Sequence, residues 1–104
     1  MADIDRDRLR NDVISDAHDD YFGLYEIVWS LNTQYPHVSR EAKVAAARDV
    51  VRSLVEGGQL SGFRTVWASN DFQPVAPGEL LAAIDDSPAW SDPTEEPYLC
   101  VAAV

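Results

Sequence analysis

The chain has 104 residues, enough for one domain with one modest core, and 46% of them are hydrophobic, which argues against disorder. Eight basic residues stand against 18 acidic ones, and the resulting net charge of −10 repels phosphates and favours basic partners. A single cysteine, Cys100, excludes an internal disulfide, and no apolar run approaches the roughly 20 residues of a membrane-spanning helix.

The first predicted helix covers residues 5–17 and has a narrow apolar side, so we expect it on the surface of the domain. Directly after it three carboxylates and an imidazole gather, from Asp16, His18, Asp19 and Asp20. Carboxylates and imidazole are metal ligands, but the spacing matches no metal motif, and Asp19 or Asp20 has a simpler role as the cap of the next helix. We therefore expect neither a metal nor another cofactor.

The second predicted helix, residues 20–33, is apolar almost all round. Its broad face is formed by Tyr21, Leu24, Ile27, Val28 and Leu31, with Phe22, Tyr25 and Trp29 beside it. Such a helix either lies at the centre of a core or offers its aromatic flank to another molecule. We favour the core, because large aromatic side chains supply much of the buried area in a domain of this size.

Residues 39–69 predict a capped helix, a glycine stop and a strand. Ser39 occupies the N-cap position, and apolar side chains then recur every three or four residues from Ala47 to Val55. Gly57 and Gly58 end this helix, because glycine takes the left-handed conformation without steric cost. The β-branched and aromatic residues that follow predict a strand over residues 60–68.

The remaining residues predict a turn at 69–71, a loop at 74–78 and a short helix at 77–85 that begins with Pro77. Residues 86–97, DSPAWSDPTEEP, are acidic and rich in turn formers. Their one large apolar side chain, Trp90, either covers an edge of the core, which we favour, or serves as a recognition element. The apolar residues 98–104 predict a strand that pairs antiparallel with residues 60–68.

Three short stretches carry a resemblance to a known fold. VVRSLVEGGQL resembles the helix-to-strand junction of winged-helix domains, and GLYEIVWSLN and SPAW with Pro93 are similar to segments of small, mostly uncharacterised winged-helix-like bacterial proteins. The resemblance covers residues 20–104 and implies an α+β fold with three N-terminal helices, then a two- or three-stranded antiparallel sheet with a short inserted helix. Residues 1–104 would form one domain, in which residues 1–19 are a peripheral helix and residues 20–104 the core.

The charge is uneven along the chain. Residues 39–64 hold five basic and three acidic residues, a net +2, which leaves −12 for the remainder. After Arg64 there are seven acidic residues and no basic one. This charge either serves solubility alone or attracts a basic partner at long range.

We expect no enzymatic activity, because the two histidines lie in separate turns, Cys100 lies in a predicted core strand, and no glycine-rich phosphate loop, HExxH or CxxC motif occurs. The favoured function is a cytoplasmic protein-interaction module. Its most concrete form is an immunity protein or inhibitor that covers the active site of a basic toxin or enzyme, with Trp90 or Trp67 as the aromatic contact. The predicted partner-binding residues are Asp85, Asp86, Trp90, Asp92, Glu95 and Glu96.

The alternative is a transcription regulator, since the winged-helix resemblance implies DNA binding. Arg48 and Arg52, with Arg40 and Lys43 on the same predicted helix, would then contact phosphates. The acidic region after Arg64 opposes DNA. We therefore expect no nucleic-acid partner unless dimerisation aligns the arginines and holds the acidic residues away.

Overall fold

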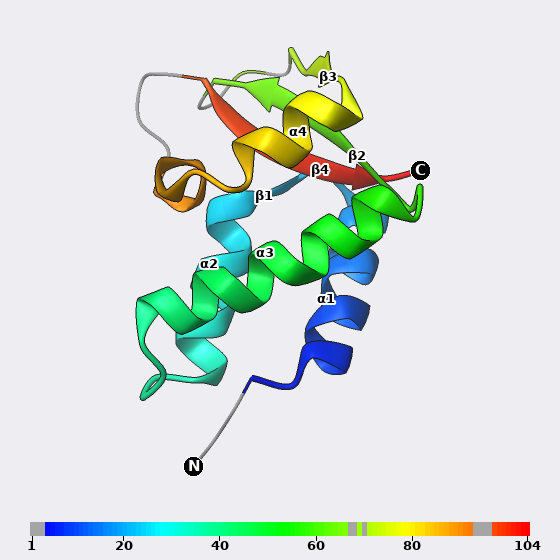
Figure 1. Cartoon of the computed structure of the whole chain (residues 1–104). Coiled ribbons are helices and arrows are strands. Elements are labelled where there is room, and N and C mark those ends of the chain that lie inside the picture. Colours follow the sequence, from blue (N-terminus) through cyan, green and yellow to red (C-terminus); the bar gives the residue numbers. More distant parts are fainter. Residues whose placement is uncertain (1–3, 67–68, 70, 93–96) are drawn as a thin grey trace.

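The computed structural model describes residues 4–66, 69, 71–92 and 97–104 of the chain, which form an α+β fold (Figure 1). In chain order the elements are α1 (Arg6–Asp19), β1 (Phe22–Gly23), α2 (Leu24–Gln34), α3 (Arg40–Glu56), β2 (Leu60–Thr65), β3 (Gln73–Val75), α4 (Pro77–Ala83), the 3₁₀-helix η1 (Ser87–Trp90) and β4 (Tyr98–Ala103). Figure 1 shows α3 crossing the middle of the molecule, with the sheet and α4 above it.

The described strands form one antiparallel sheet in the order β1-β4-β2-β3. The predicted pairing of the last strand with residues 60–68 is confirmed, with Leu60 opposite Ala103 and Thr65 opposite Tyr98. The sheet has four strands rather than the expected two or three. Both additional strands are short and lie at the edges, where they follow from pairing with a distant segment rather than from a local pattern.

The second helix begins later than its sequence pattern predicts. Phe22 and Gly23 pair with Val101 and Cys100 of β4, so this segment is a strand and α2 starts only at Leu24. The Glu26 carboxylate accepts the Gly23 N–H at 3.2 Å and holds the start of the helix. Neither Asp19 nor Asp20 caps α2, which corrects that expectation.

The third helix confirms its prediction. The Ser39 hydroxyl accepts the backbone N–H of Ala42 at 3.2 Å, as an N-cap does. At the other end Gly58 has a φ of 75°, and the N–H of Gln59 returns to the carbonyl of Leu54 at 2.9 Å, which closes the helix before β2. The apolar side of α3 is buried at Ala46, Ala47, Val50, Val51, Leu54 and Val55.

Trp90 belongs to the core. Its side chain is 1% exposed, and its Nε1 donates to the Ile84 carbonyl at 2.9 Å. The structural role favoured for this residue is therefore the observed one, and its place among the partner-binding residues is corrected, because the ring is not displayed on the surface. The buried ring of Trp90 anchors η1 to the core of the domain.

One face of the sheet carries α4. Gly62 points toward this helix, since a methyl group added there would come within 2.6 Å of Leu80, and Arg64 pairs with Glu79 of α4 at 3.4 Å. Successive side chains of a strand point to opposite faces, so Phe63 points away from α4. We call this opposite side of the sheet the rear face. Its strand residues on β2 and β4 are Ser61, Phe63, Thr65, Tyr98, Cys100 and Ala102.

Candidate functional site

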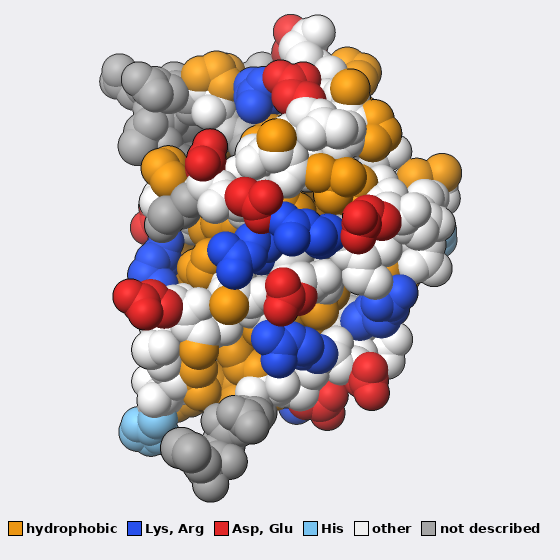
Figure 2. Space-filling model, in the orientation of Figure 1, with side chains coloured by type: hydrophobic (Ala, Val, Ile, Leu, Met, Phe, Trp, Pro, Cys, Tyr) orange, Lys and Arg blue, Asp and Glu red, His pale blue; other side chains and the backbone are white. Residues whose placement is uncertain are grey.

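All eight lysine and arginine residues lie in the described part of the chain, so the position of every basic side chain is known. Four of them form ion pairs. These pairs are Arg6–Asp49 at 3.3 Å, Arg8–Asp12 at 3.9 Å, Arg64–Glu79 at 3.4 Å, and Arg52–Asp85. Arg8–Asp12 lies within α1, and Arg6–Asp49 joins α1 to α3. Arg52–Asp85 joins α3 to the residues after α4, and Arg64–Glu79 joins β2 to α4. Figure 2 shows the consequence on the α3 side, where basic and acidic side chains alternate.

The other basic side chains also face the helices. Arg10 donates to the Ser53 hydroxyl at 3.0 Å, and Arg40 donates to the Trp90 carbonyl at 3.4 Å. Lys43 is 5% exposed, and its Nζ donates to the Asn32 side chain at 3.0 Å. Within the described residues Arg48 makes no ion pair or hydrogen bond. Most of the cations on α3 are thus already engaged inside the protein.

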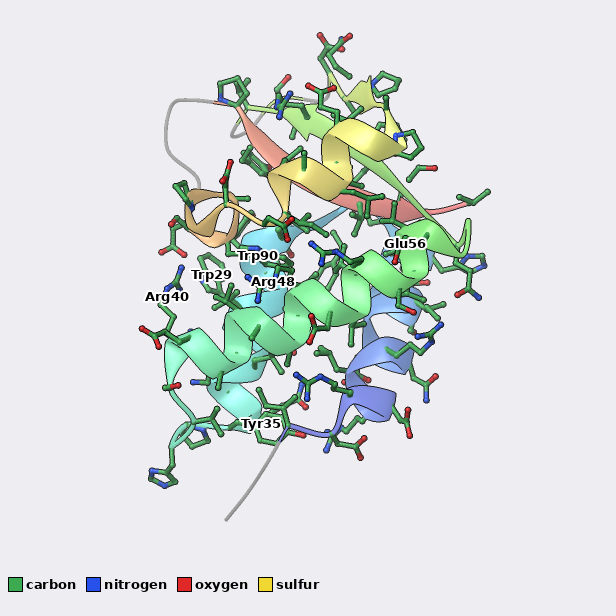
Figure 3. All side chains as sticks on the ribbon, in the orientation of Figure 1. Trp29, Tyr35, Arg40, Arg48, Glu56 and Trp90 are labelled. Atoms are coloured by element: carbon green, nitrogen blue, oxygen red, sulfur yellow. The ribbon has the colours of Figure 1, made fainter. Side chains whose placement is uncertain are left out.

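Figure 3 shows the side chains of Arg40 and Arg48 on α3, on the side of Trp90. Both arginines line one hollow between α3 and the α4–η1 segment, with a volume of about 490 Å³. Carboxylates from Glu41 and Asp85 line the same hollow. Because both signs of charge are present at its wall, this hollow has no clear preference for an anion.

The five predicted partner-binding carboxylates divide into three groups. Asp85 is held by Arg52 against α3. Asp86 and Asp92 are exposed and line one surface hollow near the start of β4. Glu95 and Glu96 lie outside the described residues, as does Trp67. Of the predicted partner-binding carboxylates that the structure describes, Asp86 and Asp92 are the two without an ion pair, and Arg64 lines the same hollow.

An exposed tryptophan lies beside this hollow, and it is Trp29 rather than Trp90. Its side chain is 47% exposed, and its Nε1 donates to Asp92 Oδ1 at 2.7 Å. The Tyr25 ring meets it edge-on at 4.9 Å and meets Tyr98 edge-on at 5.5 Å. The sequence favours a core role for the second helix over an exposed aromatic flank. Trp29 is nevertheless partly exposed to solvent.

A second aromatic group lies on the rear face. Tyr21 is 39% exposed and stacks on Phe72, with centroids 3.8 Å apart and an interplanar angle of 5°. It also contacts the edge of Phe63, at 5.0 Å. Phe63 of β2 stands opposite Cys100 of β4, and the next pair on the rear face is Thr65 with Tyr98. The ring group of Tyr21 and Phe63 therefore adjoins the ring group that contains Tyr98.

The carboxylates near the rear face affect the titration of its polar groups. Burial raises the pKa of Cys100 to about 12, and the negative charges of Glu26 and Asp20 add to this effect. Burial also raises the pKa of Tyr98, and nearby Cys100 and Glu26 act in the same direction. Burial is the main cause of both shifts, and it makes Cys100 an unreactive thiol.

The cluster of Asp16, His18, Asp19 and Asp20 lies in the last turn of α1 and at its C-cap. Among the described residues no group of three or more histidine, cysteine or carboxylate side chains is placed to hold a metal ion. Burial raises the pKa of Asp16, with repulsion from Asp12 and Asp19 adding to it. Asp20 Oδ1 accepts the backbone N–H of Tyr21 at 2.7 Å. Its carboxylate is therefore fixed next to the rear-face aromatic group.

No helix among the described residues combines the length and apolar character needed to cross a lipid bilayer. Comparison with known proteins gives no match to a family model, a curated protein or a solved structure. Any functional conclusion must therefore come from the geometry and charge of the chain itself.

Proposed function

We propose that the protein is an acidic interaction module that binds a basic protein partner. Its most concrete form is an immunity protein or inhibitor in the cytoplasm, which covers the active site of a basic toxin or enzyme. The observation that carries this proposal is the placement of charge: four of eight basic side chains are in ion pairs, while Asp86 and Asp92 lie exposed beside an exposed tryptophan.

The net charge of −10 supports fast capture of a basic protein, because long-range attraction raises the encounter rate at low salt. Asp86 and Asp92 would then occupy the positions that substrate phosphates take in a basic active site. Trp29 replaces Trp90 as the aromatic anchor, since an exposed ring that loses water on binding contributes far more than one already buried.

We also propose that the fold is winged-helix-like. The order of α1, α2, α3, β2 and β4, with α4 inserted between the two long strands, agrees with the arrangement that the resemblance implies. The DNA-binding alternative is less well supported, because a regulator would need several free cations on α3. Arg52 is paired with Asp85, which leaves Arg48 as the main candidate for a phosphate contact.

The proposal is tested by comparing two double variants of equal net charge. Asp86→Lys with Asp92→Lys changes the proposed site, whereas Asp7→Lys with Glu56→Lys changes exposed positions on α1 and α3. Binding of a lysine-rich 20-residue peptide is measured by fluorescence anisotropy at several salt concentrations. The first variant should weaken binding about tenfold more than the second at low salt.

Equal weakening by both variants would mean that the charge serves solubility and that no acidic site exists. A mobility-shift assay with duplex DNA provides the second arm. Duplex binding that falls steeply with salt and is lost in Arg48→Gln would contradict the proposal and establish the regulator.

A further inference from the structure

The rear face has both components of a site for arginine. Planar rings are present at Tyr21, Phe63 and Phe72, and the stacking of Tyr21 on Phe72 holds two of them parallel. A guanidinium group is planar and weakly hydrated, so it stacks on aromatic faces more readily than an ammonium group does. Tyr21 offers accessible ring surface for such a contact, because its side chain is 39% exposed.

One carboxylate adjoins the same rings. Asp20 precedes Tyr21 in the chain and is held by the hydrogen bond to the Tyr21 N–H, and its negative charge acts on Cys100 of the rear face. Asp20 is exposed. Asp71 lies on the α4 side instead, because its Oδ1 accepts from the side chain of Gln73, which stands opposite Arg64. A carboxylate beside an aromatic ring can accept the paired N–H groups of an arginine that stacks there.

Among the described residues no lysine or arginine pairs with Asp20. Arg64, the one basic residue on the strands, pairs with Glu79 of α4, and the other seven lie on α1 and α3, where all but Arg48 have a partner on the helices, after α4 or on η1. The undescribed residues include no lysine or arginine. The positive charge that complements the rear face must therefore come from another molecule.

The charge also decides against two other occupants. A second copy of the chain is an unsuitable occupant, because two proteins of charge −10 repel each other. Single-stranded nucleic acid stacks on aromatic side chains, but it also needs a positively charged groove for its phosphates, which the rear face lacks.

We propose that the rear face is the docking surface for an arginine-bearing segment of the basic partner, with a guanidinium stacked on the Tyr21–Phe72 pair and paired with Asp20. This rests on the proposed function and adds the surface and the residue type it recognises. Lysine would be bound less well, because a compact, strongly hydrated ammonium gains less from the rings.

Two 12-residue peptides of equal charge, one with six arginines and one with six lysines, serve as probes at about 50 mM salt. Affinity is measured by fluorescence anisotropy, and contact residues are mapped by amide chemical shifts. The arginine peptide should bind at least about fivefold more tightly than the lysine peptide. The largest shifts should fall at Tyr21, Phe63 and Phe72.

The double variant Tyr21→Leu with Phe72→Leu leaves the charge unchanged and should abolish this preference for arginine. Asp20→Asn is a second variant that keeps the rings, and it should weaken arginine binding more than Glu56→Gln, which removes one exposed charge on α3. If the double variant fails to fold, the comparison of Asp20→Asn with Glu56→Gln still decides the question.

Equal affinity for both peptides, with shifts confined to the region of Asp86 and Asp92, would overturn the arginine site and leave the acidic module intact. The absence of binding by either peptide at low salt would overturn both. Arginine preference that survives Tyr21→Leu with Phe72→Leu would place the recognition elsewhere and also reject the inference.

Discussion

Replacing Trp90 and Trp29 by phenylalanine, one at a time, should affect stability very differently, because Trp90 is buried and Trp29 is exposed. In Trp90→Phe the Ile84 carbonyl loses the indole N–H that reaches it at 2.9 Å in a buried site, which costs about 1–3 kcal/mol. The smaller ring also leaves a void, at about 1 kcal/mol more. We expect unfolding free energy to fall by about 3 kcal/mol, a large part of the roughly 5–15 kcal/mol of a domain this size.

Trp29→Phe is the matched control, because it makes the same chemical change at a 47% exposed position. Loss of its exposed hydrogen bond to Asp92 should cost less than about 1 kcal/mol, since water can replace the partner. Stability is measured by urea denaturation followed by far-ultraviolet circular dichroism, which does not depend on tryptophan fluorescence. Equal stability of the two variants, or greater loss in Trp29→Phe, would refute the assignment of Trp90 to the core.

Two further predictions concern stability. Gly62→Ala should destabilise the protein by about 1–3 kcal/mol, because the new methyl group meets the buried Leu80. Gly78→Ala should stabilise it by about 0.5–1 kcal/mol, since the added methyl group meets nothing within 4 Å and alanine favours the helix. Thermal denaturation of both variants tests these expectations. The thiol of Cys100 ionises near pH 9 in the unfolded chain and near pH 12 in the folded one, so the unfolded state loses its proton first and stability should fall between these values, by about 2 kcal/mol at pH 10.5. Cys100→Ala should show a shallower decline of unfolding free energy above pH 9, and an unchanged slope would mean that burial does not hold the thiol neutral.

Local sequence patterns predict the helices well. α3 is marked by a serine cap, a period of three to four residues and a glycine pair, all within one stretch of chain, and each of these acts locally. The start of α2 is missed because Phe22 and Gly23 gain their hydrogen bonds from β4, almost 80 residues away. β3 is missed because Pro74 suggests a loop, although proline is tolerated in a strand at the edge of a sheet.

The candidate site is harder to predict for the same reason. Composition identifies the acidic character, but it does not reveal that Arg52 would neutralise Asp85 or that Trp29 would meet Asp92, 63 residues later. The rear-face aromatic group joins Tyr21 to Phe72 from opposite ends of the sheet order. Only the tertiary fold brings such residues together, and it depends on long-range contacts that local sequence patterns do not show.

The position of β4 has a consequence for biosynthesis. This strand follows every other element in the sequence, yet it lies inside the sheet between β1 and β2. A nascent chain that has emerged only through η1 can form its helices from local contacts, but β1 and β2 have no strand between them. Protection from cellular proteases should therefore arise in one late step, when residues 98–103 leave the ribosome and insert.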